Sequence, residues 1–368
     1  MDYNILSRQV LETSLGVRRG DKVWINSWDH TVGLANNLSS ECRRRGCEAT
    51  VTVQQESEWV SSIVAGPTRL LRELSPQQSA LLGESDHYVF TLGPKHPVKW
   101  ASIPERRRKF ATIWFLEQNE FVKEWKSIAT RRRVKMIGIE ATLATKERAR
   151  ALGIDYRIYL ETVFAGCIID SHELGRRSKE LASILGGRGV VRLTTPGGTD
   201  LRFDLDKRPV ERSDGLVTEE DARKGRVVFL PAGATGTTVD EESAEGTIVY
   251  DNPIRMSNGT IEELTFQVRD GRVTKSAASR GLSVFKEYLS GEQGDGDRFA
   301  FFGFGLNPRL RLGCTQDDKV LGAVELNFGE NQTRGGNNEG SRNFWGTVNG
   351  ATVSVEGREI MRRGKLLV

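Results

Sequence analysis

The pattern of apolar residues changes partway along the chain, and this change limits the folds open to it. Over roughly the first 140 residues, helix-like and strand-like stretches alternate. Lys22–Ser27 has the composition of a buried strand, and Val32–Arg45 repeats apolar residues at helical spacing until Gly46. Further strand candidates follow at 48–53, 87–93, 109–115 and 134–140. Such alternation predicts an open, mostly parallel α/β sheet with helices on both faces.

The second half of the chain is dominated by short strands. One long helix is predicted over Ser171–Leu185, with Asp170 as its N-cap and Gly186 at its end. Turns such as PGGTD and RDGR separate the strand candidates 190–195, 200–205, 226–232, 246–251, 262–268, 271–276, 299–305, 323–329, 351–357 and 358–364. We therefore expect an α/β domain over residues 1–170 and an α+β domain over 171–368, the latter a largely antiparallel sheet or open barrel.

Composition excludes several classes of protein. No run reaches the roughly 18 apolar residues needed to cross a bilayer, and the first residues contain no apolar signal core, so we expect a cytoplasmic protein without a membrane partner. Cys42 and Cys47 do not have a zinc or redox spacing, which predicts reduced thiols. The basic runs 106–109 and 131–133 lack any nucleic-acid module, and the net charge is only +4, so no nucleic-acid partner is predicted.

The motifs of several enzyme classes are missing. The chain has no GxSxG, no GxxxxGK[ST] and no HExxH sequence, and GGRG at 186–189 reads as the end of a helix. The four histidines are His30, His87, His96 and His172. A C-terminal domain without further histidines cannot build an imidazole metal site of its own.

A set of motifs resembles a known family. LGVRRGDKVWINS, GGTDLRFDLDKRPV, KGRVVFLPAGATGTTVDEESAEGTIVYD, LTFQVRDGRVTK, FFGFGLNP and DDKVLGAVELNFGEN occur in the order seen in the thermophilic aminopeptidase family, which includes aminopeptidases T and S. The resemblance covers nearly the whole chain. A metal-dependent dihydroxypyridine ring-cleaving dioxygenase looks like a more distant relative with the same scaffold.

The resemblance implies a site for two divalent metals held by carboxylates and histidines. The ligand positions of the family fall here on Ala234, Phe301, Glu325, Phe344 and Gly346. Because only Glu325 can bind a cation, we expect that the family's metal site is absent and that no cofactor is used. The alternative is a divalent zinc, cobalt or manganese ion held by other carboxylates, namely Glu325 with Asp240, Glu241, Glu330 or Glu339. The resemblance also matches Glu241, for which we expect a supporting role in the fold.

Strand alternation in AVELNF separates Glu325 and Asn327 from the apolar residues of the same strand. If this polar face looks into the family's metal cleft, Glu325 could accept a ligand amine, or act as a general base if burial raises its pKa. It could equally pair with a nearby arginine or face water. The candidate partners are Arg309, Arg311, Arg334 and Arg342.

The loop at 329–343, GENQTRGGNNEGSRN, allows two interpretations. Arg334 and Arg342 could clamp a carboxylate or phosphate of an amide-rich ligand, with Arg309 nearby, or the loop could be a flexible surface segment. Phe344 and Trp345 after the loop, together with Phe301, could form an apolar wall of the cleft, or the first two could be core residues.

Three functions are compatible with these residues. The first is a metal-free member of the aminopeptidase scaffold that binds a peptide or amino-acid-like ligand, as a partner protein or as a biosynthetic enzyme. The second is a metal-dependent aminopeptidase with rearranged carboxylate ligands. The third is the ring-cleaving oxygenase, whose iron needs two histidines and a carboxylate, and the lack of histidine after residue 172 disfavours it. The resemblance further implies a homodimer.

Overall fold

The computed structural model describes residues 2–99, 102–111, 120–256, 258–291, 294–340 and 343–368. The chain forms two compact units. The first comprises Met1–Ser171 and Gly215–Pro231, and the second comprises His172–Asp214 and Ala232–Val368. None of the helices in these described ranges is both long enough and apolar enough to cross a membrane.

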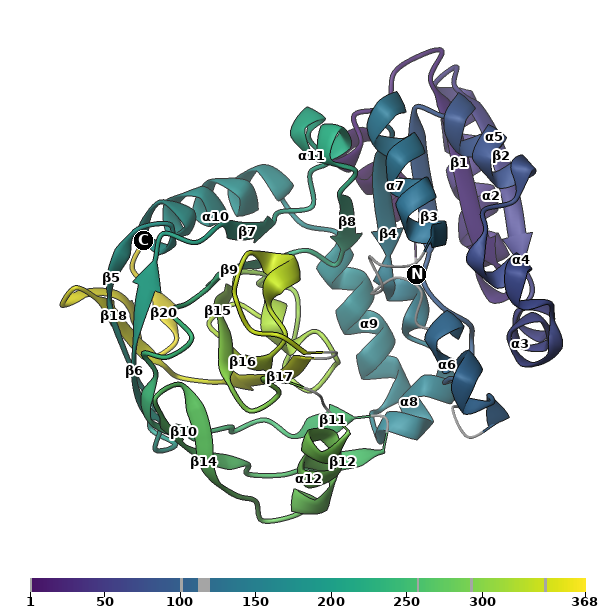
Figure 1. Cartoon of the computed structure of the whole chain (residues 1–368). Helices are drawn as coiled ribbons and strands as arrows, with labels where there is room; N and C mark the ends of the chain where they lie inside the picture. Colours follow the sequence, from purple (N-terminus) through teal and green to yellow (C-terminus); the bar gives the residue numbers. More distant parts are fainter. Residues whose placement is uncertain (1, 100–101, 112–119, 257, 292–293, 341–342) are drawn as a thin grey trace. The chain divides into compact units, whose positions relative to one another are not determined.

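The first unit is built on a parallel sheet in the order β2-β1-β3-β4-β8 (Figure 1). Its strands are β1 (Lys22–Trp28), β2 (Glu48–Gln54), β3 (His87–Thr91), β4 (Lys135–Ile139) and β8 (Val227–Leu230). Its α-helices are α1 (Tyr3–Arg8), α2 (Val32–Arg44), α3 (Glu56–Ala65), α4 (Thr68–Arg72), α5 (Pro76–Glu84), α6 (Glu105–Ala111), α7 (Glu120–Arg132), α8 (Lys146–Leu152), α9 (Tyr156–Cys167) and α11 (Glu219–Lys224). This confirms the predicted α/β class.

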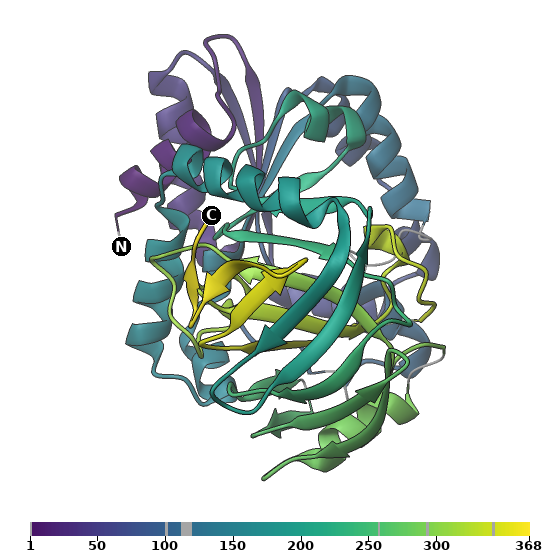
Figure 2. The same ribbon diagram turned by 90° about the vertical axis from the view of Figure 1, so that its left-hand side faces the viewer.

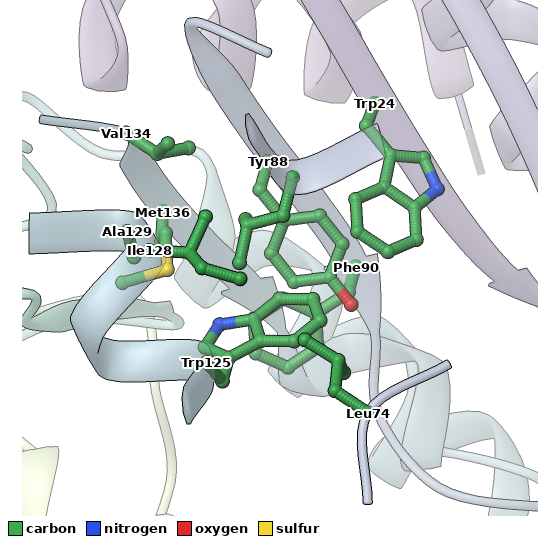
Figure 3. Packing of buried hydrophobic residues seen from close by; sticks show 10 residues of the cluster. Trp24, Leu74, Tyr88, Phe90, Trp125, Ile128, Ala129, Val134 and Met136 are labelled. Atoms are coloured by element: carbon green, nitrogen blue, oxygen red, sulfur yellow. The ribbon is translucent and has the colours of Figure 1, made fainter. Parts of the chain in front are cut away.

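An aromatic cluster joins one face of this sheet to helices α5 and α7. Figure 3 shows the rings of Trp24, Tyr88, Phe90 and Trp125 packed together. The ring centroids of Trp24 and Tyr88 lie 4.7 Å apart, and those of Tyr88 and Trp125 lie 4.9 Å apart. Val23 and Ile25 point the opposite way along β1 and are also buried, so the second face is covered too.

Two predictions for this region were wrong. The predicted strand 109–115 begins inside helix α6, and its residues 112–115 lie outside the described part of the chain. The predicted boundary at residue 170 also placed 215–231 in the second domain. In the structure this segment returns to the first unit, because β8 pairs in parallel with β4 and continues its sheet.

The second unit contains an eight-stranded antiparallel sheet in the order β14-β13-β10-β6-β5-β18-β19-β20. Figure 2 shows the long strands β5 and β6 beside the C-terminal strands. The strands are β5 (Arg188–Thr194), β6 (Asp200–Asp206), β10 (Glu245–Val249), β13 (Thr265–Arg269), β14 (Arg272–Ala277), β18 (Thr352–Val355), β19 (Arg358–Arg362) and β20 (Lys365–Leu366). Helix α10 (Ser171–Leu185) precedes β5 as predicted, and α12 (Leu282–Ser290) follows β14.

A second antiparallel sheet, in the order β17-β16-β15-β9-β7, lies within this unit (Figure 1). Its strands are β7 (Val210–Ser213), β9 (Ala234–Thr238), β15 (Phe299–Gly305), β16 (Val324–Gly329) and β17 (Asn343–Val348). A short hairpin joins β11 (Ile254–Met256) to β12 (Gly259–Ile261). One face of the five-stranded sheet packs on aromatic residues, including Phe203, which contacts Phe299 and Phe302 at centroid distances of 5.1 and 5.0 Å. The other face carries the candidate site.

Candidate functional site

The strand register places Glu325 in a row of five residues across the five-stranded sheet. Glu325 in β16 pairs with Thr347 in β17 and with Gly303 in β15. The row continues from Gly303 to Gly236 in β9 and ends at Glu211 in β7. Directly paired residues of antiparallel strands point to the same face. Two glycines therefore separate Glu325 from Glu211 on this face, which we call the polar face.

Glu325 is a buried carboxyl group with an altered proton affinity. Its side chain is only 4% exposed, and Asn327 Nδ2 donates a hydrogen bond to its Oε1 at 2.6 Å. Burial, with a further contribution from Asp318, raises the pKa of Glu325 to about 7, against the opposing effects of Arg334 and the Asn327 hydrogen bond. Glu325 can therefore exchange a proton near neutral pH, as a general acid or base must.

The glycines of the row make room for a phenylalanine ring. A Cβ atom at Gly236 would come within 2.5 Å of the Phe301 ring, and one at Gly303 would come within 3.0 Å of that ring and 3.2 Å of Glu325 Oε2. Phe301 therefore lies over the two glycine positions, beside the carboxyl group. Phe301 is 3% exposed, so its ring is buried next to this carboxyl group.

Arg334 covers the ring of Phe301. Its Cζ atom lies 3.7 Å from the centroid of Phe301 and 5.9 Å from that of Trp345. Its Nε and Nη2 atoms lie 3.0 and 2.8 Å from Glu211 Oε2. Trp345 is 49% exposed and pairs with Asn327 across β16 and β17, so it stands at the accessible rim of the polar face.

Two buried oxygen atoms on this face have no hydrogen-bond partner among the described residues. They are Oδ1 of Asn327 and Oγ1 of Thr238, whose side chains are 1% and 0% exposed. Thr238 pairs with Phe301, which pairs with Asn327, so both lie in the row next to that of Glu325. Buried polar atoms are usually satisfied, and such exceptions are often associated with a ligand or water. The face thus offers unused acceptor atoms.

The loop after β16 is held by its asparagines. Asn331 is fully buried, and its Nδ2 donates to Glu241 Oε1 at 3.0 Å and to the Ala300 carbonyl at 2.9 Å. Asn338 Nδ2 donates to the carbonyls of Phe299 and Gly329, each at 3.1 Å. These bonds contradict the interpretation of 329–343 as a flexible surface segment, at least for its described residues. Nothing in the sequence pattern distinguished these internal asparagines from solvated ones.

The predicted lining residues divide into two groups. Phe301, Glu325, Asn327, Arg334 and Trp345 come together on the polar face. Arg309 and Arg311 are exposed in the loop after β15. Arg342 lies outside the described residues.

The assignment of Phe344 to the cleft was wrong. Phe344 pairs with Phe328, and Gly346 pairs with Leu326, so both point to the opposite face of the sheet. The ring of Phe344 is 1% exposed and lies 5.0 Å from that of Phe285, within the aromatic core. A one-residue shift exchanges the two faces of a strand. Trp345 and Thr347 are therefore the β17 residues that face Glu325.

The donor atoms on the polar face do not fit the metal centre that the resemblance implies. Ala234 and Phe301 lie on this face with Glu325, but neither side chain can coordinate a cation. Across the described ranges, no three His, Cys, Asp or Glu side chains are arranged to hold a metal ion. A guanidinium group also lies over Phe301. One carboxylate and one amide oxygen are a poor ligand set for a divalent ion.

Comparison with known proteins places this chain in context. Residues 4–296 match the family described as thermophilic metalloprotease (M29), and this match ends before β15. The fold is similar to that of wild-type AmpT from Thermus thermophilus, with a TM-score of 0.69, 15% identity, and coverage of 100% of this chain and 99% of the other. It is also similar to 2,5-dihydroxypyridine dioxygenase from Pseudomonas putida KT2440, with a TM-score of 0.65, 14% identity, and coverage of 100% and 97%. No curated protein matches.

Proposed function

The chain belongs to the thermophilic metalloprotease (M29) family, and from that premise we propose that it is a member that works without the family's metal site. In this proposal the polar face binds a peptide or amino-acid-like ligand. Glu325 receives the ligand's amino group or acts as its general base. The protein is then a partner protein or a biosynthetic enzyme. A cytoplasmic location and a homodimer stay predictions.

The observation that carries this proposal is the acceptor set around Glu325. Among the described residues, none donates a hydrogen bond to Glu325 Oε2, and none is a partner for the buried Asn327 Oδ1. A primary ammonium group has three N–H donors and no acceptor, so it would satisfy these two oxygens directly. A neighbouring positive charge also favours the ionised carboxylate, so binding would release a proton from Glu325 when the pH is below 7.

The rim of the face would contact the rest of the ligand. Trp345 offers an exposed ring, and Arg334 has one guanidinium nitrogen, Nη1, that makes no hydrogen bond or ion pair to the described residues. An aromatic ring contributes contact area to a bound side chain, and a guanidinium N–H can donate to a backbone carbonyl or carboxylate.

Binding of matched small ligands tests the proposal. We expect isothermal titration calorimetry to detect binding of leucyl-glycine and of leucinamide, and at least tenfold weaker binding of N-acetyl-leucinamide, which lacks the ammonium group. Glu325→Gln should weaken binding of the free amines by at least tenfold. Glu242→Gln is the matched control, since its side chain is exposed and pairs with Arg298. Equal binding of acetylated and free ligands would contradict the proposal.

The second candidate is a metal-dependent aminopeptidase with rearranged carboxylate ligands. The effect of Asp318 on the pKa of Glu325 favours it, because it puts a second carboxylate near the first. Of the carboxylates first considered, Glu241 already accepts hydrogen bonds from Asn331 and from the Asn337 backbone and pairs with Arg208. Cleavage of leucyl or arginyl anilide that depends on added zinc, cobalt or manganese would support this candidate over the first.

A further inference from the structure

The loop after β16 holds Arg334 by its backbone. The backbone N–H of Arg334 donates to the Asn331 carbonyl at 3.0 Å, and Asn331 is fully buried. Gly335 follows in a left-handed conformation with φ +88°, and a Cβ atom there would come within 2.9 Å of Pro209. Glycine adopts this conformation without strain. The side chain of Arg334 therefore starts from a fixed point.

The guanidinium group of Arg334 is fixed as well, but only along one edge. Its Nε and Nη2 atoms bind Glu211 Oε2 at 3.0 and 2.8 Å, and its Cζ atom lies 3.7 Å from the centroid of Phe301. Among the described residues, none accepts a hydrogen bond from Nη1, and the side chain is 21% exposed. Because the guanidinium group is planar and rigid, fixing one edge also fixes the other. Nη1 is therefore a positioned donor that remains for a ligand.

The ring under this donor lies beside the atoms that the ligand amine would contact. The Cβ position of Gly303 is 3.0 Å from the ring of Phe301 and 3.2 Å from Glu325 Oε2, so the ring and the oxygen flank the same point. Asn327 pairs with Phe301 in the ladder, which places their Cβ atoms about 5 Å apart. The guanidinium group covers the same ring. An amine held by Glu325 and Asn327 would therefore bring the next group of the ligand close to Arg334.

The charges on this part of the face favour a neutral group at that position. Glu211 already pairs with Arg334, so their two charges balance. Glu325 holds the ligand amine as a carboxylate, and a second carboxylate next to that amine would be repelled by the first. A peptide or amide carbonyl carries no net charge and needs only a donor, which Nη1 supplies.

We propose that Arg334 determines the specificity of this site by donating from Nη1 to the carbonyl group next to the ligand's amino group. The site then takes peptides and amino-acid amides in preference to free amino acids and simple amines. This inference rests on the proposed binding of a ligand amine at Glu325 and Asn327. It adds the residue that distinguishes among ligands that all carry an amine.

The test is calorimetric titration with three ligands that share one side chain and one amine, namely leucinamide, leucine and 3-methylbutylamine, which lacks the amide. The wild type should bind leucinamide roughly tenfold or more tightly than either of the others, the scale of a hydrogen bond from a charged donor. In Arg334→Met, leucinamide and 3-methylbutylamine should bind about equally. Arg362→Met is the matched control, since Arg362 also pairs with a glutamate, Glu359, but at an exposed position of β19, and the preference should be unchanged.

Equal binding of leucinamide and 3-methylbutylamine to the wild type would overturn the inference and leave amine binding at Glu325 intact. This comparison needs no variant, so it decides the question even if Arg334→Met does not fold. A preference that survives in folded Arg334→Met would also overturn it, as would tighter binding of leucine than of leucinamide, which would make Arg334 a carboxylate clamp. Binding of none of the three ligands would instead contradict the proposed function itself.

Discussion

Glu325 lies directly opposite Gly303 in the ladder between β15 and β16, and a Cβ atom at Gly303 would come within 3.2 Å of Glu325 Oε2. The same Cβ atom would lie 3.0 Å from the ring of Phe301. The glycine therefore sets the space in which the carboxyl group and the ring lie side by side.

Gly303→Ala should destabilise the protein by about 1–3 kcal/mol, the usual cost of overpacking a close-fitted interior. It should also weaken binding of free-amine ligands, because the new methyl group crowds Oε2. Chemical denaturation and calorimetry measure these two effects. Gly83→Ala in helix α5 is the control, where a Cβ atom meets nothing within 4 Å and helix propensity predicts a gain of about 1 kcal/mol.

The stability of the protein should depend on pH through Glu325. Folding raises its pKa from 4.5 to about 7, so between these values the native state retains a proton that the unfolded chain releases. Its contribution to stability is full below pH 4.5 and is lost as the pH rises to 7. The wild type should lose about 1–3 kcal/mol relative to Glu325→Gln across this interval. A constant difference between the two proteins from pH 4.5 to 8 would show that the carboxyl group is not perturbed.

Asn331→Ala should cost about 2–4 kcal/mol of stability, since it removes hydrogen bonds to Glu241, Ala300 and Asn338 and leaves buried groups without partners. Gln332→Ala, at the exposed neighbouring position, should change stability by less than about 0.5 kcal/mol. Denaturant titration of both variants measures the difference. Equal and small effects would indicate that the loop is flexible after all.

Phe344→Ala and Trp345→Ala form a matched pair across the two faces of β17. Phe344→Ala should destabilise the protein by about 3–5 kcal/mol, because its ring is buried in the aromatic core. Trp345→Ala should have a much smaller effect on stability, but it should weaken ligand binding. Thermal unfolding combined with calorimetry separates the two roles. A large loss of stability in both variants would contradict the assignment of Trp345 to the rim.

The order of segments along the sequence was sufficient to predict the class of fold, because helices and strands alternate in the first unit and short strands separated by turns dominate the second. It was not sufficient to assign β8 to its sheet. The stretch 226–232 follows several strands of the second unit, and only its parallel pairing with β4 shows where it belongs. Pairing between strands distant in the sequence leaves no local signal.

Only part of the site could be predicted from the sequence, because the rest depends on how distant segments pair. Glu325 and Asn327 lie two residues apart in one strand, so their common face follows from strand geometry alone. The choice between Phe344 and Trp345 depends on the register of β17 against β16, and an error of one residue reverses the face. The position of Arg334 depends on the buried bonds of Asn331, whose burial no local pattern indicates.

The metal content of the purified protein tests the central claim most directly. Mass spectrometry of inorganic elements should find far less than one equivalent of zinc, cobalt, manganese or iron per chain, and prolonged treatment with a chelator should leave ligand binding unchanged. One or two tightly held equivalents of a divalent metal, with binding lost on chelation and restored by the metal, would contradict the account.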